Sequence, residues 1–236
     1  MQQHSKLNID PEELAKFKQH AQSWWDPKGT IKSLHDINPL RLGYIEQNYP
    51  LKGTKILDVG CGGGLLSEAM AKKGAAVVGV DANESLINVA KLHALESELC
   101  VDYQTNTAEQ FAHDNKERFD LITCLELLEH VPDPASLIAS LSVMLKPQGK
   151  LVVSTVNRNP KSFVQAIVAA EHFLRLVPKG THEYKKFIKP SELSQWCEQA
   201  GLEIKNMKGM TYNPLSKQYR LTDDVSVNYL AYVEKI

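Results

Sequence analysis

Residues 56–64 read Ile-Leu-Asp-Val-Gly-Cys-Gly-Gly-Gly, and seventeen residues after Gly64, Asp81 closes the apolar run Ala-Val-Val-Gly-Val at 76–80. A buried strand that ends in glycines, a helix, and a second strand that ends on a carboxylate form a nucleotide-binding half of a Rossmann-like sheet. The glycines let the backbone approach the ligand, and the acid binds ribose hydroxyls. The alternative is a glycine-rich turn without a ligand, but such a turn needs only one or two glycines.

The spacing of the glycines decides which nucleotide the loop suits. A dinucleotide fingerprint, G-x-G-x-x-G/A, would place Gly or Ala at position 65, where this chain has Leu65. The pattern G-x-G-x-G after an aspartate instead resembles motif I of class I S-adenosylmethionine-dependent methyltransferases. For Asp81 the alternative is a helix N-cap, because Asn83-Glu84 begins a helix just beyond it. The expected cofactor-binding residues in this region are Asp58, Gly60, Gly62 and Asp81.

Composition and charge bound the function classes. The chain has 236 residues, a formal net charge of −1 and a pI of about 6.7, so no global basic field indicates a nucleic-acid partner. Residues 1–8 lack the apolar core of a signal peptide, and no stretch reaches the ~20 apolar residues of a spanning helix. The four cysteines are too scattered for a zinc site or a dense disulfide framework, and small buried thiols indicate a reducing cytoplasm.

Strand and helix patterns alternate from residue 54 onward, which predicts a mostly parallel, doubly wound α/β sheet with helices on both faces. The expected strands span 54–59, 76–81, 101–105, 119–125, 149–156, about 202–210 and about 226–233. The expected helices span 10–25, a segment starting at Asn38-Pro39, 64–73, 84–96, 107–112, 134–145 and about 191–200. Methyltransferases of class I insert their last strand antiparallel, so the resemblance implies a seven-stranded sheet.

Four segments follow from this pattern. Residues 1–50 would form an N-terminal helical cap, and residues 51–156 the S-adenosylmethionine-binding α/β core. Residues 157–189 would form a basic amphipathic insert after the fifth strand, and residues 190–236 would complete the same sheet. The whole chain is therefore expected to be a single domain.

The fourth expected strand runs directly into Leu125-Glu126-Leu127-Leu128-Glu129-His130. Ligands in an open α/β sheet bind beyond the carboxyl ends of the strands, so this segment belongs at the mouth of the site. Glu126, Glu129 and His130 stand at i, i+3 and i+4 and share one face if the turn is helical. They suit a hard divalent cation such as Mg²⁺ or Mn²⁺, and His130 also suits a general base. The alternative is that Glu129 and His130 only cap and hydrogen-bond around the turn at 132–134.

A phenolic methyl acceptor needs a group of this kind. The methyl group of a sulfonium donor is already activated, whereas a phenol with a pKa of about 10 is about three units too weakly acidic at pH 7, a deficit of roughly 4 kcal/mol. A base, or a cation that stabilises the phenolate, supplies most of that difference. Alignment of the nucleophile, the methyl group and the sulfur supplies much of the rest. We therefore expect Glu126, Glu129 and His130 to serve catalysis.

Residues 157–189 differ in charge from the rest of the chain. The segment contains seven Lys or Arg residues and two Glu residues, a net charge of about +5 in a chain that totals −1. Apolar residues at 163, 167, 170, 174 and 177 repeat at the spacing of one helical stripe. A basic amphipathic helix too short to span a bilayer is typical of elements that lie on anionic membrane surfaces. A lid over the active site is an equally good interpretation, and the two are compatible.

Motifs spread along the chain make the resemblance more specific. They are Trp24-Trp25-Asp26, residues 37–44 (Ile-Asn-Pro-Leu-Arg-Leu-Gly-Tyr), the glycine loop, residues 90–94 (Ala-Lys-Leu-His-Ala), residues 129–134 (Glu-His-Val-Pro-Asp-Pro), Asn157-Arg158-Asn159 and residues 177–182 (Val-Pro-Lys-Gly-Thr-His). With these motifs the chain resembles, over nearly its whole length, the ubiquinone-biosynthesis O-methyltransferases. These bacterial enzymes methylate polyprenyl-catechol and demethylubiquinol intermediates.

The resemblance implies roles for individual residues. Arg41 would contact the carboxylate of the methionine moiety of S-adenosylmethionine, Gly60 the backbone of the cofactor, Asp81 its ribose and Leu125 its adenosine region. A divalent cation would map to the same three residues as the catalytic cluster, Glu126, Glu129 and His130. The lipid-associating segment of the family would map to residues 157–189. Ala82-Asn83, after Asp81, departs from the small residues of related sequences, a difference that bears on cofactor affinity rather than on family membership.

The favoured interpretation is an O-methyltransferase of polyprenyl phenols and quinols, cytoplasmic and peripheral to the inner face of the cell membrane, with quinone-biosynthesis proteins as further partners. A nicotinamide-dependent oxidoreductase is disfavoured by Leu65 and by the lack of a Tyr-x-x-x-Lys pair. A non-catalytic S-adenosylmethionine-binding scaffold would not need Glu126, Glu129 and His130 together. A methyltransferase of another small phenolic acceptor is a further alternative.

Overall fold

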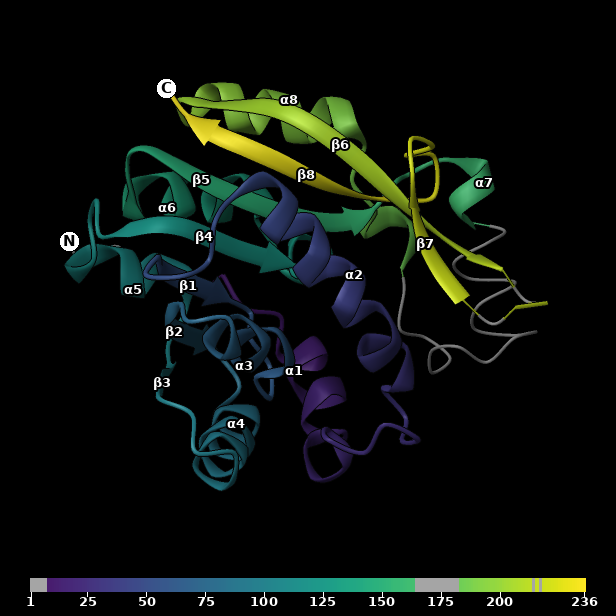
Figure 1. Ribbon diagram of the computed structural model, residues 1–236. Coiled ribbons are helices and arrows are strands. Elements are labelled where there is room, and N and C mark those ends of the chain that lie inside the picture. The colour runs from purple at the N-terminus through teal and green to yellow at the C-terminus, as the bar shows by residue number, and fades with distance from the viewer. Residues whose placement is uncertain (1–7, 164–182, 214, 217) are drawn as a thin grey trace.

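Strands from both halves of the chain join in one eight-stranded sheet, in the order β3-β2-β1-β4-β5-β8-β6-β7 (Figure 1). The computed structural model describes residues 8–163, 183–213, 215–216 and 218–236. The first five strands run parallel to one another, and β8 pairs antiparallel with both β5 and β6. The strands are β1 (Lys55–Val59), β2 (Ala76–Asp81), β3 (Val101–Thr105), β4 (Phe119–Leu125), β5 (Leu145–Val156), β6 (Leu202–Asn213), β7 (Gln218–Thr222) and β8 (Asn228–Lys235).

Helices cover both faces of the sheet. Consecutive residues of a strand point to opposite faces, so Ile56 packs in a cluster with α2 and α3, whereas Leu57 packs in a cluster with α5, α6 and α8. Both residues are fully buried, which explains why the parallel strands read as continuous apolar runs. The helices are α1 (Pro11–Lys18), α2 (Lys32–Asn48), α3 (Leu65–Lys72), α4 (Glu84–Glu96), α5 (Ala108–Asp114), α6 (Pro134–Met144), α7 (Pro160–Ser162) and α8 (Pro190–Gln199), with short 3-10 turns η1 (Ala21–Ser23), η2 (Leu128–His130) and η4 (Tyr184–Lys186).

The predicted class I fold, a mostly parallel doubly wound sheet with the last strand inserted antiparallel, is confirmed. The predicted strand count of seven is wrong, because β7 adds an eighth strand to the sheet. This five-residue strand pairs antiparallel with residues 209–213 of β6. Its polar and apolar residues alternate, but so short an edge strand forms only because β6 offers it a free edge. An alternating pattern of only five residues is too short to predict β7 from the sequence.

The second helix begins earlier than the sequence indicates. Asn38-Pro39 was expected to open it, because proline favours the first turn of a helix. Instead α2 begins at Lys32 and carries Pro39 inside. Its buried residues Ser33, Ile37 and Arg41 recur every four positions, so packing of one face extends the helix on the N-terminal side of the proline. The helix expected at 10–25 is likewise divided into α1 and the turn η1.

Only the two ends of the basic insert fall among the described residues. Asn159 caps α7 at its start, and Lys161 forms an ion pair of 2.6 Å with Asp224. At the far end, Lys186 in η4 pairs with Asp10 at 3.1 Å and with Glu13 at 3.3 Å. Most of the predicted amphipathic stripe, from residue 167 to residue 177, lies outside the described residues.

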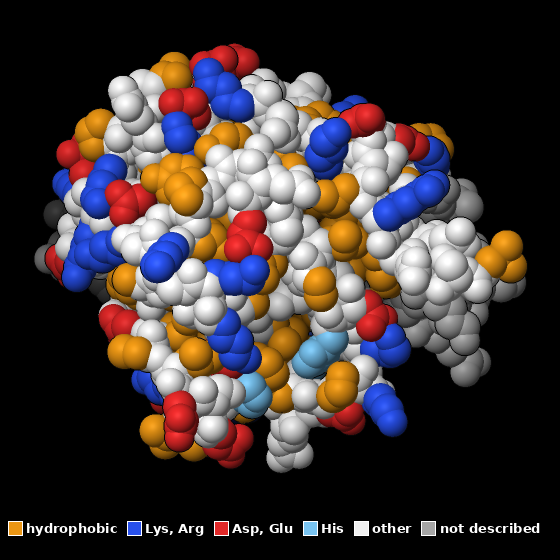
Figure 2. Space-filling view, in the orientation of Figure 1, with side chains coloured by type: hydrophobic (Ala, Val, Ile, Leu, Met, Phe, Trp, Pro, Cys, Tyr) orange, Lys and Arg blue, Asp and Glu red, His pale blue; other side chains and the backbone are white. Residues whose placement is uncertain are grey.

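Positive and negative side chains are interspersed on the surface shown in Figure 2, with hydrophobic side chains between them. The described residues on this face therefore produce no extended field of one sign. Among the helices of the described part of the chain, none is both long enough and apolar enough to cross a bilayer.

Gly209 tests how closely the loop between β7 and β8 approaches β6. A Cβ at Gly209 in β6 would lie 2.0 Å from the backbone oxygen of Asp224, whereas a Cβ at Gly43 in α2 would meet nothing within 4 Å. We expect Gly209→Ala to lower the free energy of unfolding by about 1–3 kcal/mol, because the backbone must shift. Gly43→Ala, the matched control, is expected to raise it by about 0.5–1 kcal/mol through helix propensity. Urea unfolding measures both, and a Gly209→Ala protein as stable as the wild type would contradict the close approach.

Candidate active site

A cavity of about 720 Å³ follows the carboxyl edge of the sheet. It lies where the strand order reverses between β1 and β4, which is the usual ligand position in an open α/β sheet. The ends of β1, β2 and β4 form its floor, and α1, α2, β6 and β7 also contribute side chains to its lining. A volume of this size is typical of a site for a cofactor or a drug-sized ligand.

The glycine loop adopts a backbone that other residues rarely accept. Gly60, Gly62 and Gly64 have φ angles of 72°, 54° and 93°. A Cβ at Gly62 or at Gly63 would also lie within 2.5 Å of the ring of Trp24, so an indole lies directly against the loop. The loop thus needs glycine both for its turns and for this close contact.

Asp81 holds the loop from the neighbouring strand. One carboxylate oxygen accepts a hydrogen bond from the backbone N–H of Gly62 at 2.9 Å, and the other accepts from the N–H of Asn83 at 2.8 Å. Asn83 caps α4, because its side chain accepts from the N–H groups of residues 85 and 86; Asp81 is therefore not the N-cap. Burial raises the pKa of Asp81, although these two hydrogen bonds act to lower it.

Asp58 lies beneath the loop with both oxygens engaged. It accepts hydrogen bonds from Ser67 at 2.6 Å and from Thr123 at 2.7 Å, and it is 3% exposed. Burial raises the pKa of Asp58 to about 6, against the opposing effect of the two hydroxyl groups. The geometry makes Asp58 a brace between α3 and β4 under the cofactor loop.

Arg41 projects from α2 into the same cavity. Its guanidinium Nη2 lies 3.2 Å from Oε1 of Glu126, and its side chain is 8% exposed. Neither Nε nor Nη2 has a hydrogen-bond partner of good geometry among the described residues. A buried cation with spare donors at the edge of a cavity suits an anionic group of a ligand.

The two glutamates after β4 turn to different partners. Glu126 has a left-handed backbone, with φ of 52°, and its Oε1 accepts a hydrogen bond from Ser154 at 2.6 Å. Glu129 is 4% exposed and accepts at Oε2 from Thr155 at 2.8 Å, while its Oε1 has no partner among the described residues. Burial, and then the charge of Glu126, raise the pKa of Glu129 well above its ordinary value.

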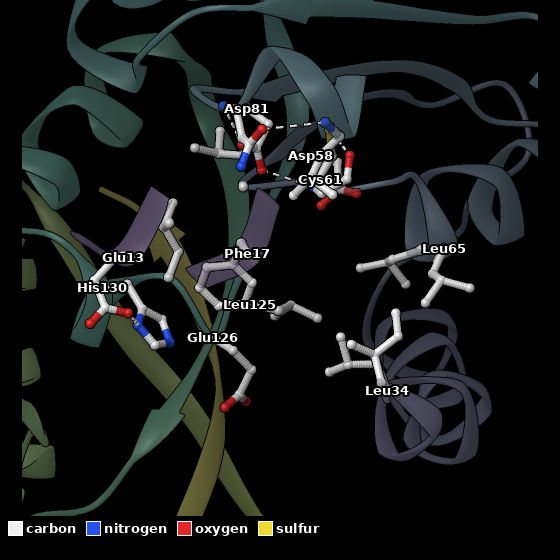
Figure 3. Close-up of a pocket in the computed structure, with 18 of the residues that line it drawn as sticks. Glu13, Phe17, Leu34, Asp58, Cys61, Leu65, Asp81, Leu125, Glu126 and His130 are labelled. Carbon is white, nitrogen blue, oxygen red and sulfur yellow. Dashed lines mark hydrogen bonds and ion pairs between the residues drawn. The ribbon is translucent and has the colours of Figure 1, made fainter. Parts of the chain in front are cut away.

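His130 ends the turn η2 and pairs with the N-terminal helix. Its Nδ1 lies 2.8 Å from Oε2 of Glu13, and Phe17, one turn further along α1, packs edge-on against the imidazole with centroids 5.1 Å apart (Figure 3). The hydrogen bond to His130 lowers the pKa of Glu13 to about 2, although burial opposes it. Burial lowers the pKa of His130, but Glu13 and then Glu129 outweigh it and raise the pKa overall.

The predicted residues thus share one region without forming a metal shell. Arg41, Asp58, Gly60, Gly62, Asp81, Leu125, Glu126 and His130 all line the cavity. Glu129 instead faces Thr155 in the interior. Within residues 8–163 and the described parts of 183–236, no group of three or more His, Cys, Asp or Glu is placed to hold a metal ion. Glu126, Glu129 and His130 as arranged therefore do not fit a divalent cation.

Sequence reasoning missed the N-terminal contributors to the site. Glu13 reads as an ordinary acid in the first turn of a helix, and only the fold brings it to His130, 117 residues away. Phe17 reads as one apolar residue of an amphipathic helix. The tandem Trp24-Trp25 was a usable signal, because two adjacent indoles cannot both face one helical core.

Comparison with known proteins identifies the family. A family model described as a methyltransferase domain matches residues 35–206. A ubiquinone biosynthesis O-methyltransferase of Marinobacter nauticus is 58% identical over 225 residues, which cover 94% of this chain and 94% of the relative. This chain belongs to the ubiquinone biosynthesis O-methyltransferase family. Relatives of the same name from Hahella chejuensis and Saccharophagus degradans are 55% and 53% identical, over 97% and 98% of this chain and 96% and 98% of their own lengths.

Solved structures agree on the fold. A magnesium protoporphyrin IX methyltransferase from Synechocystis with bound SAH superposes with a TM-score of 0.67 at 18% identity, over 95% of this chain and 100% of that one. A methyltransferase from Thermotoga maritima, described as a possible histamine N-methyltransferase, gives the same TM-score, identity and coverage. This member of the family is an S-adenosylmethionine-dependent O-methyltransferase, so the predicted fold class, enzyme class and cofactor are confirmed. The glycine backbone and the spare donors of Arg41 fit that cofactor.

The ion pair between Glu13 and His130 should make the free energy of unfolding depend on pH in the acid range. Because the pKa of Glu13 falls from 4.5 to about 2 on folding, the pair stabilises the protein fully above pH 4.5, and this contribution is lost as the pH falls towards 2. Glu13→Gln should therefore lower the free energy of unfolding by about 2 kcal/mol at pH 6 and by much less at pH 2.5. Glu12→Gln, at the exposed neighbouring position, is the control and should change little. Urea unfolding at both pH values measures the difference; a loss independent of pH would contradict the ion pair.

Proposed function

We propose that this enzyme methylates the phenolic hydroxyls of polyprenyl-catechol and demethylubiquinol intermediates in ubiquinone biosynthesis. The observation that carries the proposal is 52–58% identity, over nearly the full length, to relatives named for that pathway. The cavity supports it, because Leu34, Ile37 and Met210 give its α2 and β6 side an apolar lining suited to a lipid-like acceptor.

We further propose how the chain holds its cofactor. The spare donors of Arg41 support a contact with the carboxylate of the methionine moiety. The left-handed backbone of Gly60 and Gly62, which line the cavity, supports close approach of the cofactor, and Asp81 at the end of β2 supports a contact with ribose hydroxyls. Leu125, at the end of β4, would contact the adenosine region. Asp58 would support the loop from beneath without touching the cofactor, because its two oxygens accept hydrogen bonds from the hydroxyl groups of Ser67 and Thr123.

Catalysis would then centre on the acceptor hydroxyl. The bound cofactor supplies an activated methyl group, so the protein has to supply a phenolate in line with it. The Nδ1–H of His130 donates a hydrogen bond to Glu13, which leaves Nε2 as the nitrogen that can face the hydroxyl of the methyl acceptor. In this arrangement His130 takes the phenolic proton at Nε2, and Glu13 stabilises the imidazolium that forms. Glu126 and Glu129 would contribute negative charge that favours the same protonated state.

A divalent cation on Glu126, Glu129 and His130 would require these side chains to rearrange, because as arranged in the described part of the chain they do not converge on one ion. The Oε1 of buried Glu129, which has no partner among the described residues, is a ligand atom that is free for it. The three side chains have other partners as they stand, so we derive no step through a metal.

Turnover of a short-tailed catechol tests the proposal. With methyl-labelled S-adenosylmethionine we expect a labelled methyl ether, and we expect His130→Ala to lower kcat at least 100-fold while the affinity for S-adenosylhomocysteine stays within about twofold. His113→Ala, which removes an exposed imidazole on α5, is the control and should be fully active.

The outcomes separate the alternatives. An unchanged rate after chelation, together with loss in His130→Ala, supports the direct base. Loss of turnover on chelation, with restoration by Mg²⁺, supports the cation instead. Cofactor binding without any methyl ether contradicts the proposed enzyme and supports a scaffold or another acceptor.

We also propose that residues 157–189 dock the enzyme on the inner face of the cell membrane, where a polyprenyl tail resides. The net charge of the segment supports contact with anionic lipid, and Phe163 and Lys185 at its ends are exposed. Of the basic residues in this segment, Lys161 and Lys186 form ion pairs within the fold. Headgroup contact would therefore depend more on Arg175, Lys179 and Lys185. Binding to other quinone-biosynthesis proteins stays a prediction.

Flotation with anionic liposomes tests the docking. We expect retention that falls but does not vanish as salt rises, because headgroup attraction is screened and apolar burial is not. Ile167→Glu with Leu174→Glu should release the protein. Leu92→Glu with Leu95→Glu, on the exposed surface of α4, is the matched control and should still float. If the first double variant floats like the wild type, the segment is not the membrane contact.

A further inference from the structure

Five buried side-chain atoms in the described part of the chain are polar and have no hydrogen-bond partner. Two are carboxylate oxygens, of Glu68 and Glu129. The other three are donors, the indole Nε1 of Trp24 and the Nε and Nη2 of Arg41, and both residues line the cofactor cavity. Nη2 of Arg41 is nevertheless ion-paired with Glu126 at 3.2 Å, so Nε of Arg41 and Nε1 of Trp24 are the donors left without any partner in the described part of the chain. An unsatisfied buried donor costs about 1–3 kcal/mol, so these two donors around one cavity indicate a ligand that accepts from both.

Trp24 is held rigidly in this position. It is 5% exposed and packs with Ala21, Ile31 and Leu86. Its backbone oxygen lies 2.8 Å from Nε2 of His35, which ties the end of η1 to α2. Its ring lies against the glycine loop, since a Cβ at Gly63 would be 2.3 Å from Cδ1 and 2.7 Å from Nε1 of the indole. The ring therefore has little freedom to reorient, and its N–H has no acceptor within the described part of the protein.

The adjacent tryptophan shows the contrast. Trp25 donates its indole N–H to the backbone oxygen of Gly63 at 2.9 Å, and its ring stacks on His93 with centroids 3.4 Å apart. Trp25 thus satisfies its donor within the protein and anchors the N-terminal segment to the loop. Trp24 leaves an equivalent donor unused beside the same glycines.

We propose that Trp24 is a cofactor-binding residue, whose indole N–H donates a hydrogen bond to the carboxylate of the methionine moiety of S-adenosylmethionine, next to Arg41. The ammonium group of that moiety has only donors, and the sulfonium is a cation, so neither can accept from an N–H. Asp81 marks the ribose position at the end of β2. The carboxylate is the one anion of the cofactor, and it accepts several hydrogen bonds at once. The inference concerns the cofactor alone and holds whichever acceptor the enzyme uses.

Trp24→Phe tests the contact, because it removes the N–H and keeps an aromatic ring over the loop. Calorimetry should compare S-adenosylhomocysteine with 5′-methylthioadenosine, which lacks the amino-acid end. We expect the Kd for S-adenosylhomocysteine to rise about tenfold or more and the Kd for 5′-methylthioadenosine to stay unchanged. Trp25→Phe is the matched control, and any loss there should be equal for the two ligands. Equal losses in Trp24→Phe, or none, would overturn the proposal.

A second measurement leaves Trp24 itself unchanged and observes its indole N–H directly. The chain has three tryptophans, so its indole N–H signals can be assigned in ¹⁵N-labelled protein with Trp25→Phe and Trp196→Phe. S-adenosylhomocysteine should move the Trp24 indole proton downfield, as a new hydrogen bond to a carboxylate does, and 5′-methylthioadenosine should not. An indole signal that responds alike to both ligands, or to neither, would show that Trp24 only covers the loop.

Discussion

The glycine loop between β1 and α3 is the constraint on which the rest of the site depends. Its left-handed turns bring a bare stretch of backbone to the switch point of the sheet, where Asp81 fixes it through the N–H of Gly62. Any Cβ at Gly62 or Gly63 would collide with Trp24. The same absence of side chains therefore allows both ligand approach from the cavity and coverage by the N-terminal segment.

The N-terminal segment completes a site that the sheet only begins. α1 brings Glu13 and Phe17 to His130, η1 is followed by Trp24 over the loop, and α2 brings Arg41 to Glu126. One short stretch of chain therefore contacts both the glycine loop, where the cofactor would bind, and His130, where the methyl acceptor would bind. Lys186, at the end of the basic insert, pairs with Glu13 as well, so a segment proposed to meet the membrane adjoins the partner of the proposed base.

Charge distribution explains why so many acids can lie near one cavity. Each buried carboxylate has specific donors: Ser67 and Thr123 for Asp58, two backbone N–H groups for Asp81, and Thr155 for Glu129. Burial raises the pKa of all three, whereas Glu13, paired with His130, has a lowered pKa. The pKa of Glu13 thus differs from the pKa values of Asp58, Asp81 and Glu129 because of their surroundings and not because of residue type.

The sequence by itself determined the sheet core, the cofactor loop with Asp81, and the family, because these depend on local patterns: continuous apolar runs, glycine spacing and short motifs. It did not determine β7, whose five residues form a strand only against the edge of β6, or the start of α2, where packing overrides the proline signal. Only the tertiary structure decided that Glu126, Glu129 and His130 take separate partners. The reason is that those partners lie 26 to 117 residues away, and no local spacing specifies contacts made at such distances along the chain.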